Sequence, residues 1–66
     1  MTKINALLVK KELVNTVDGA LNKFRINLND WDRSKVLYNS NGEGYVIYTI
    51  VCTKDQFESI KQNINY

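Results

Sequence analysis

Residues 45–52 constrain the fold of this chain more than any other segment. The segment reads Tyr-Val-Ile-Tyr-Thr-Ile-Val-Cys, so seven of its eight side chains are apolar. β-Branched and aromatic residues of this kind favour a strand. A strand in a sheet that is open to water on one side should alternate apolar with polar residues. Because this strand is apolar on both faces, a sheet that contains it needs cover on both sides.

The dipeptide Asn41-Gly42 precedes this strand and is a strong short-range signal for a β-hairpin. A two-residue loop at this dipeptide pairs Tyr38 with Tyr45 and Leu37 with Val46. The sequence therefore predicts a hairpin in which Tyr38 and Tyr45 lie side by side on one face.

Residues 9–28 allow two interpretations. The dipeptide Asp18-Gly19 predicts another hairpin, in which Leu13 pairs with Phe24 and Lys11 pairs with Ile26. The same segment fits an amphipathic helix, because its apolar residues from position 13 to position 24 fall on one helical stripe. Residues 15–19, Asn-Thr-Val-Asp-Gly, make a poor helix interior, and glycine alone costs about 1 kcal/mol relative to alanine. We therefore favour the hairpin, with a helix over residues 10–25 as the alternative.

The end of the chain carries the signals of a helix. Thr53 and Gln56 have the spacing of a capping box. Phe57, Ile60 and Ile64 form an apolar stripe, which predicts a helix from Lys54 to about Ile64. The sequence thus predicts one α+β domain over residues 1–66, with a four-stranded antiparallel sheet, built from two hairpins, followed by one C-terminal helix. The alternative order is α-β-β-α, with residues 10–25 helical.

The residue types that are missing exclude several function classes. The chain has no histidine, which is the usual proton shuttle near neutral pH, and no glycine pattern that cradles phosphate. Its single cysteine, Cys52, cannot form a disulfide within the chain or build a zinc site alone. Asp30 and Asp32 are interpreted as solvated turn residues. We expect no catalytic residues, no metal site and no cofactor, and hence no enzyme.

Compartment and origin are also suggested by the composition. A lone thiol fits a reducing interior, no signal peptide is visible, and the longest apolar run is far shorter than the ~20 residues that span a bilayer. These observations predict a cytoplasmic protein that does not contact membranes. The richness in asparagine, lysine and isoleucine is typical of AT-rich genes and suggests a bacterial or phage origin.

A small chain with this strand should need a partner. A core of this size supplies only about 3–5 kcal/mol, and one helix can cover only one face of the sheet. The apolar residues left on the other face indicate an interaction site. We expect a homodimer.

Two stretches resemble a known family. They are residues 50–64, where the last strand leads into the helix, and residues 27–31, where Asn-Leu-Asn-Asp precedes Trp31. These two stretches, together with the predicted order of four antiparallel strands and a final helix, resemble the positive-cofactor-type (whirly-like) transcriptional coactivators. The resemblance implies binding of single-stranded DNA by a dimer. The chain departs from that family at Gly42-Glu43-Gly44, where an acidic residue replaces the basic residue typical of the family.

Cations and aromatic rings are the groups that bind single-stranded nucleic acid. The candidate phosphate-binding residues are Lys10, Lys11, Lys23, Arg25, Arg33 and Lys35, and the candidate stacking residues are Trp31, Tyr38, Tyr45 and Tyr48. In the favoured hairpin Lys10, Lys23 and Arg25 share one face. The alternative is a protein-interaction module or inhibitor that binds a host protein through Trp31, Arg33, Tyr38 and Tyr45, since Trp, Tyr and Arg are enriched in interface hot spots.

Overall fold

The computed structural model describes residues 2–65, which form an α+β fold. The expected α+β class, with a four-stranded antiparallel sheet and a C-terminal helix, is confirmed. The elements follow in the order β1 (Thr2–Lys10), the 3₁₀ turn η1 (Lys11–Leu13), α1 (Val14–Lys23), the 3₁₀ turn η2 (Leu28–Asp30), β2 (Trp31–Arg33), β3 (Leu37–Tyr38), β4 (Gly44–Thr53) and α2 (Lys54–Asn63).

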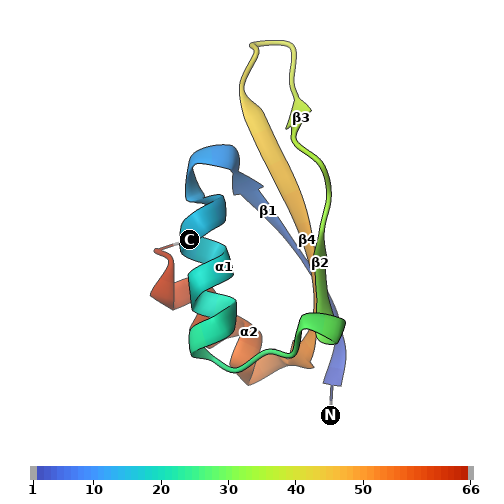
Figure 1. Cartoon of the computed structure of the whole chain (residues 1–66), viewed down its shortest axis with the longest axis vertical. Coiled ribbons are helices and arrows are strands. Elements are labelled where there is room, and N and C mark those ends of the chain that lie inside the picture. Colours follow the sequence, from blue (N-terminus) through green and yellow to red (C-terminus); the bar gives the residue numbers. More distant parts are fainter. Residues whose placement is uncertain (1, 66) are drawn as a thin grey trace.

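Strand β4 lies at the centre of the sheet (Figure 1). Strand β1 pairs with one edge of β4 along its full length, from Thr2 opposite Thr53 to Lys10 opposite Tyr45. The short strands β2 and β3 pair with the other edge of β4. Since β1 and β2 both run antiparallel to β4, they are parallel to each other and are connected through α1. This arrangement is a split β-α-β unit.

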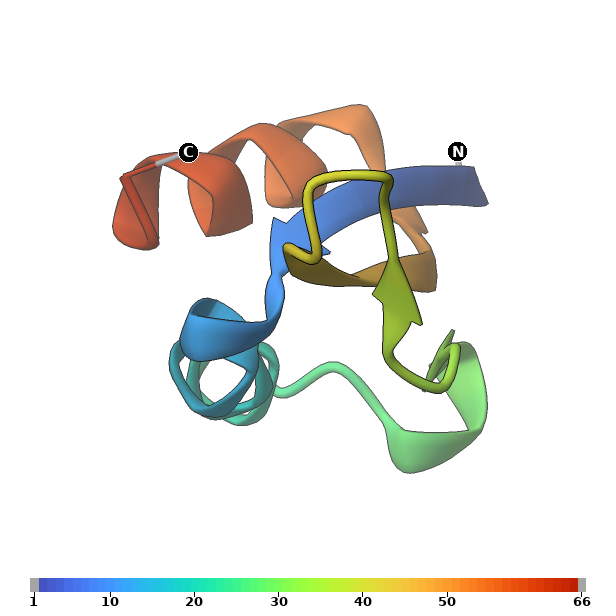
Figure 2. The same ribbon diagram turned by 90° about the horizontal axis from the view of Figure 1, so that it is seen from above.

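Both helices cover the same face of the sheet, as Figure 2 shows from above. The buried core lies between the helices and this face. Its residues come from β1, α1, β4, α2 and the residue after α2: Leu7, Val9, Val17, Ala20, Leu21, Val46, Tyr48, Ile50, Cys52, Ile60 and Ile64. Alternate residues of β4 therefore point into the core, and the residues between them lie on the face that no helix covers.

The hairpin expected at Asp18-Gly19 is wrong. The alternative, a helix over residues 10–25, is correct in the type of element, but a strand, β1, precedes the helix, so the order α-β-β-α is not observed. Residues 14–23 form α1, which buries Val17, Ala20 and Leu21 to 2% exposure or less. Gly19 lies on the exposed side of α1, where it costs helix propensity without disturbing the packing. Burial of the apolar stripe against β4 outweighs the weak local propensity that favoured a hairpin.

The segment after α1 turns sharply in a Schellman motif. The Ile26 N–H donates to the Leu21 carbonyl at 2.9 Å, and the Arg25 N–H donates to the Asn22 carbonyl at 3.0 Å. Arg25 adopts the left-handed conformation, with φ of 59°, which this motif requires. Phe24 and Ile26, which the expected hairpin places in a strand, therefore belong to a helix end and its cap.

The hairpin between β3 and β4 is present, but its register differs by one residue from the prediction. The loop is one residue longer than expected: Gly42 donates to the Asn39 carbonyl at 3.0 Å, and Asn39 donates to the Glu43 carbonyl at 3.1 Å. Gly42 has φ of 81°, which glycine adopts at low cost. Tyr38 consequently lies opposite Gly44 instead of Tyr45. A shift of one residue moves a side chain to the other face of the sheet.

Helix α2 confirms the predicted capping box. The Gln56 N–H donates to Thr53 Oγ1 at 3.1 Å, and the Thr53 N–H donates to Gln56 Oε1 at 3.0 Å. The helix ends at Asn63, close to the expected boundary at Ile64. Its stripe packs on the core through Phe57, Ile60 and Ile64.

Candidate interaction surfaces

The open face of the sheet is the side that no helix covers, and it carries apolar side chains. Along β1 it presents Ile4, which is 73% exposed, and Leu8, which is 54% exposed. Along β4 it presents Ile47 opposite Leu8, and Val51 opposite Ile4. A sheet face exposed to water is expected to be polar, so this surface has the composition of a contact surface.

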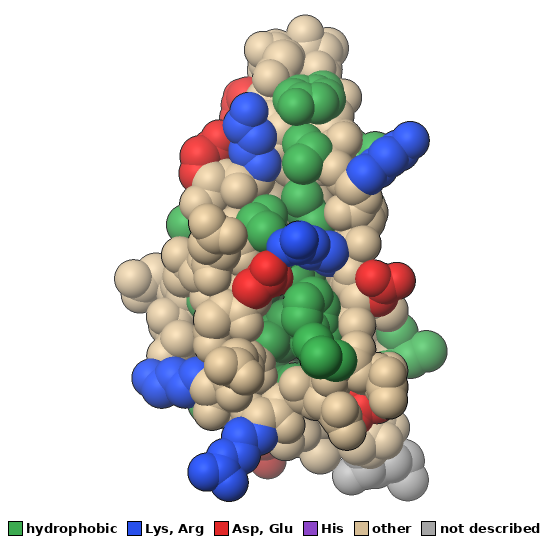
Figure 3. All heavy atoms as spheres, in the orientation of Figure 1, with side chains coloured by type: hydrophobic (Ala, Val, Ile, Leu, Met, Phe, Trp, Pro, Cys, Tyr) green, Lys and Arg blue, Asp and Glu red, His purple; other side chains and the backbone are tan. Residues whose placement is uncertain are grey.

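A groove of about 540 Å³ lies between the start of α1 and the segment that joins β2 to β3. Figure 3 shows a column of hydrophobic side chains along this side of the molecule, with basic side chains on both sides of it and across its middle. Three of the candidate phosphate-binding residues line this groove: Lys11, Arg33 and Lys35. The structure thus brings Lys11 close to Arg33 and Lys35, which lie 22 and 24 residues further along the sequence.

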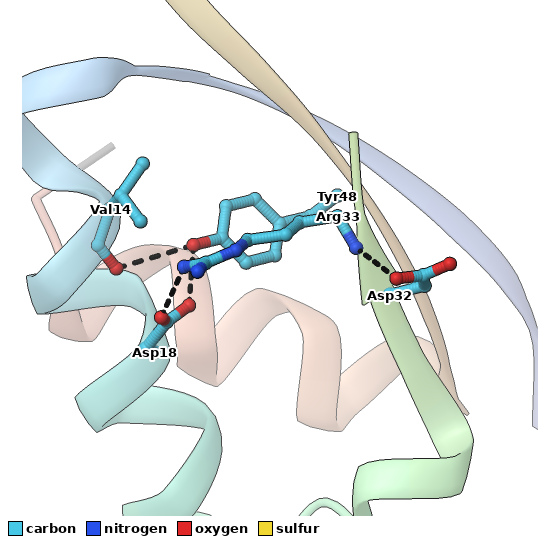
Figure 4. A network of polar contacts seen from close by, with 5 residues as sticks. All are labelled: Val14, Asp18, Asp32, Arg33 and Tyr48. Carbon is cyan, nitrogen blue, oxygen red and sulfur yellow. Dashed lines mark hydrogen bonds and ion pairs between the residues drawn. The ribbon is translucent and has the colours of Figure 1, made fainter. Parts of the chain in front are cut away.

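Arg33 crosses from β2 toward α1 and is already paired there (Figure 4). Its Nη1 atom donates to Asp18 Oδ2 at 2.5 Å. The Tyr48 hydroxyl donates to Asp18 Oδ1 at 2.5 Å and lies 3.2 Å from the Val14 carbonyl oxygen. Asp18 therefore joins α1 to both β2 and β4. Arg33 is thus an ion-pair partner, and among residues 2–65 Lys11 and Lys35 are the groove cations that have no ion pair.

Tyr48 is fully buried, which has a consequence for its protonation. Burial, with a further contribution from the hydrogen bond to Asp18, raises the pKa of Tyr48 to about 12. The phenol therefore stays neutral at physiological pH and remains a donor to the Asp18 carboxylate. Tyr48 was a candidate for base stacking, but it holds the core together and is not accessible to a ligand.

Tyr38 lies beside the basic groove because Gly44, its partner across the strands, has no side chain. A Cβ at Gly44 would lie 2.7 Å from Lys11 Cδ and 3.2 Å from Tyr38 Cε1. The Lys11 ammonium lies 5.7 Å from the centroid of the Tyr38 ring, which is 62% exposed. This is a cation–π contact at the surface. Tyr38 is thus an exposed predicted stacking residue that lies next to a groove cation.

The remaining candidate nucleic-acid-binding residues lie at separate places in the fold. Lys10 and Tyr45 lie opposite each other on β1 and β4, and both line a second groove of about 550 Å³. Lys23 donates to Asn63 Oδ1 at 3.3 Å, and Arg25 caps the end of α1. The expected shared face of Lys10, Lys23 and Arg25 is wrong, because the ten residues of α1 separate its two ends by about 15 Å.

Trp31 is the first residue of β2 and packs against the core. Its ring packs against that of Tyr48, with the centroids 5.9 Å apart, and it adjoins the core as a partly buried residue. The residue that sequence reasoning missed is Asp18. The sequence places Asp18 in a turn, whereas its role depends on the position of α1, which no local signal in the sequence indicates.

Cys52 and the acidic residues are the side chains of this chain that could ligate a metal ion. Cys52 is buried, and burial raises the pKa of its thiol. The hydrogen bond from Asn5 lowers this pKa, but by less than burial raises it. Within residues 2–65, no three His, Cys, Asp or Glu side chains form a group that could hold a metal ion. None of the helices in this range is long and apolar enough to cross a membrane.

Comparison with protein-family models, with curated proteins and with solved structures gives no match. The resemblance to the transcriptional coactivators rested on four strands followed by one helix. The observed order inserts α1 between β1 and β2.

Proposed function

We propose that this protein is a small non-enzymatic binding module whose open sheet face receives a partner protein. The observation that carries the proposal is the exposure of Ile4, Leu8 and Ile47 on one face of a sheet whose other face already holds the core. These side chains lie outside the buried core of the monomer. Burying apolar surface at roughly 25 cal/mol per Å² would stabilise a complex instead.

A capture experiment tests this proposal. The tagged chain, incubated with a lysate of its source organism, is expected to retain a partner in stoichiometric amount. The Ile47→Lys variant places a charge in the middle of the open face and should lose that partner. Leu28→Lys is the matched control, because Leu28 is 78% exposed but lies in η2, outside the open face. Retention of the same partner by the Ile47 variant, or capture of no stoichiometric partner by the wild type, contradicts the proposal.

A second candidate function is binding of single-stranded nucleic acid in the basic groove. It is supported by the convergence of Lys11, Arg33 and Lys35, with Tyr38 beside them. With two or three phosphate contacts on a single strand, the logarithm of the binding constant should fall as the logarithm of the salt concentration rises, with a slope of about −1.4 to −2.

Fluorescence anisotropy with an oligo-dT strand at two ionic strengths measures this slope. The double variant Lys11→Glu/Lys35→Glu should abolish binding, whereas Lys54→Glu, a lysine at the start of α2, should not. Binding that is absent at low salt, or that both variants retain, removes this candidate.

A homodimer is the second element of the proposal, because a core of this size supplies only about 3–5 kcal/mol and a second copy would add buried surface. The free, buried Cys52 supports a reducing, cytoplasmic setting.

A further inference from the structure

The outer edge of β1 is unpaired along nine residues. Strand β1 is the end strand of the sheet, and within residues 2–65 no other strand pairs with its outer side. Unpaired edges of this length template the addition of another strand, and proteins usually protect them with proline, charges or bulges. Between Lys3 and Lys10 this edge has no charged residue and no proline. The edge is therefore open to a strand from outside the monomer.

The hydrogen bonds of β4 show which residues present this edge. The Ile47 N–H donates to Ser34 Oγ at 3.0 Å, and the Ile47 carbonyl accepts from the Ser34 N–H at 2.9 Å. Both groups of Ile47 thus point away from β1, so Ile47 and its β1 partner Leu8 form a pair without hydrogen bonds between them. By alternation, Ile4, Ala6 and Leu8 direct their backbone N–H and C=O groups outward.

We propose that β1 pairs with β1 of a second copy, antiparallel, with a two-fold axis at Ala6. This inference rests on the homodimer of the proposed function and assigns its interface. In this register Ala6 exchanges two hydrogen bonds with Ala6 of the second copy, and Ile4 does so with Leu8 of the second copy. The result is one continuous sheet that spans both copies, with both open faces on the same side.

The sequence of β1 is self-complementary in this register. An axis at Asn5 or Leu7 would also pair outward backbone groups, but only an axis at Ala6 pairs all nine residues of the strand. It sets Ile4 against Leu8 twice on the open face, and such apolar cross-strand pairs contribute about 0.2–1 kcal/mol each. It also keeps like charges apart, because Lys3 lies opposite Val9 and Lys10 lies opposite Thr2.

The dimensions of the edge predict the strength of the dimer. Nine residues at about 3.4 Å each give a contact about 30 Å long, on a sheet about 10 Å thick. Roughly 300 Å² per copy is below the ~800 Å² per partner of standard interfaces. We therefore expect a reversible dimer with a dissociation constant in the micromolar range, rather than an obligate one.

Analytical ultracentrifugation of the intact chain, from about 10 µM to about 1 mM, tests the dimer. The mass is expected to rise with concentration from 7.7 kDa toward twice that value. A mass that stays at 7.7 kDa throughout overturns both the homodimer and its interface.

Cysteine cross-linking tests the interface. A hydrogen-bonded antiparallel pair has Cα atoms about 5.5 Å apart, which is within the range of a disulfide. The Ala6→Cys variant should therefore form a covalent dimer on mild oxidation, while the native Cys52, 1% exposed, does not compete. Thr49→Cys is the matched control, because Thr49 lies on the same face but on the central strand. A dimer in which Thr49→Cys cross-links and Ala6→Cys does not overturns the β1 interface and leaves the homodimer standing.

A proline variant provides an independent test. Ala6→Pro removes a backbone N–H that points outward, so the bonds between β1 and β4 remain. Circular dichroism should show a folded chain, and the dissociation constant should rise at least tenfold relative to that of Ala6→Ser. Should Ala6→Pro fold and dimerise as well as Ala6→Ser, the interface is wrong. If Ala6→Pro does not fold, Ala6→Lys takes its place, because it sets two like charges opposite each other at the axis and is expected to give the same increase.

Discussion

Gly19 and Gly42 form a natural pair for testing the helical assignment of α1. In the structure Gly19 lies inside α1 on its exposed side, and Gly42 lies in the β3–β4 loop with φ of 81°. A Cβ added at either position meets no atom within 4 Å. Replacing each glycine by alanine therefore changes only the backbone preference of the chain. The loss of glycine flexibility in the unfolded state is the same for both variants.

The two substitutions should have opposite signs. At Gly19, alanine gains about 1 kcal/mol of helix propensity, and the free energy of unfolding should rise by that amount. At Gly42, alanine must adopt the left-handed region, which costs about 1–2 kcal/mol. For a domain of this size, 1 kcal/mol corresponds to a shift in Tm of about 4–8 °C. Gly19→Ala should raise Tm by about this amount, and Gly42→Ala should lower it by as much or more.

Thermal unfolding followed by circular dichroism, with urea titration at one temperature, measures both shifts. A hairpin at Asp18-Gly19 would require positive φ at Gly19, so Gly19→Ala would then destabilise the protein as Gly42→Ala does. A lower Tm for both variants would refute the helix and, with it, the assignment of Asp18 as the residue that joins α1 to the sheet. The test does not depend on any ligand.

Three further substitutions probe the contacts that hold the helices in place. Arg25→Gly should stabilise the fold by about 0.5–1 kcal/mol in urea titrations, because glycine adopts the left-handed cap of α1 freely, whereas Arg25→Ala should give no such gain. The pKa of Tyr48 is raised from 10.0 to about 12 in the folded state. The contribution of the neutral phenol to the free energy of unfolding is therefore complete below pH 10 and is lost as the pH rises from about 10 to about 12. Urea midpoints across this range should fall more steeply for the wild type than for Tyr48→Phe, and parallel curves would contradict the role of the buried phenol. Thr53→Ala should cost about 1 kcal/mol by removing the N-cap of α2, with Thr53→Ser as the control that retains it, and equal stabilities of the two would count against the capping box.

The elements predicted correctly from the sequence are those whose signals are local. Strand β4 is specified by its own run of β-branched and aromatic residues, and α2 by the Thr53–Gln56 spacing and the stripe that follows it. Alternation along β4 also separates its core face from its open face, because alternation along a single strand needs no information from elsewhere. The predicted register of the β3–β4 hairpin was wrong by one residue. The register depends on whether the loop has two residues or three, and Asn-Gly is compatible with both.

Helix α1 could not be predicted with the same certainty, because two local patterns in residues 9–28 support different structures. The choice between them is made by the core face of β4, where Val46, Tyr48 and Ile50 are buried and need more cover than α2 alone provides. The ion pair of Arg33 with Asp18 depends in turn on where α1 lies. The groove between α1 and β2 is therefore a property of the tertiary structure, and only a list of candidate cations was accessible from sequence.

The split topology also explains why the apolar surface and the unpaired edge occur together. With α1 connecting β1 to β2, both helices lie on one side of β4, and no remaining element of residues 2–65 is available to cover the other side or to extend the sheet beyond β1. Polar residues at Ile4, Leu8 and Ile47 would leave the buried core unchanged, since none of these side chains belongs to it. The proposed contact with another molecule would account for their apolar character, and the proposed pairing through β1 would place two such faces next to each other in one larger docking surface.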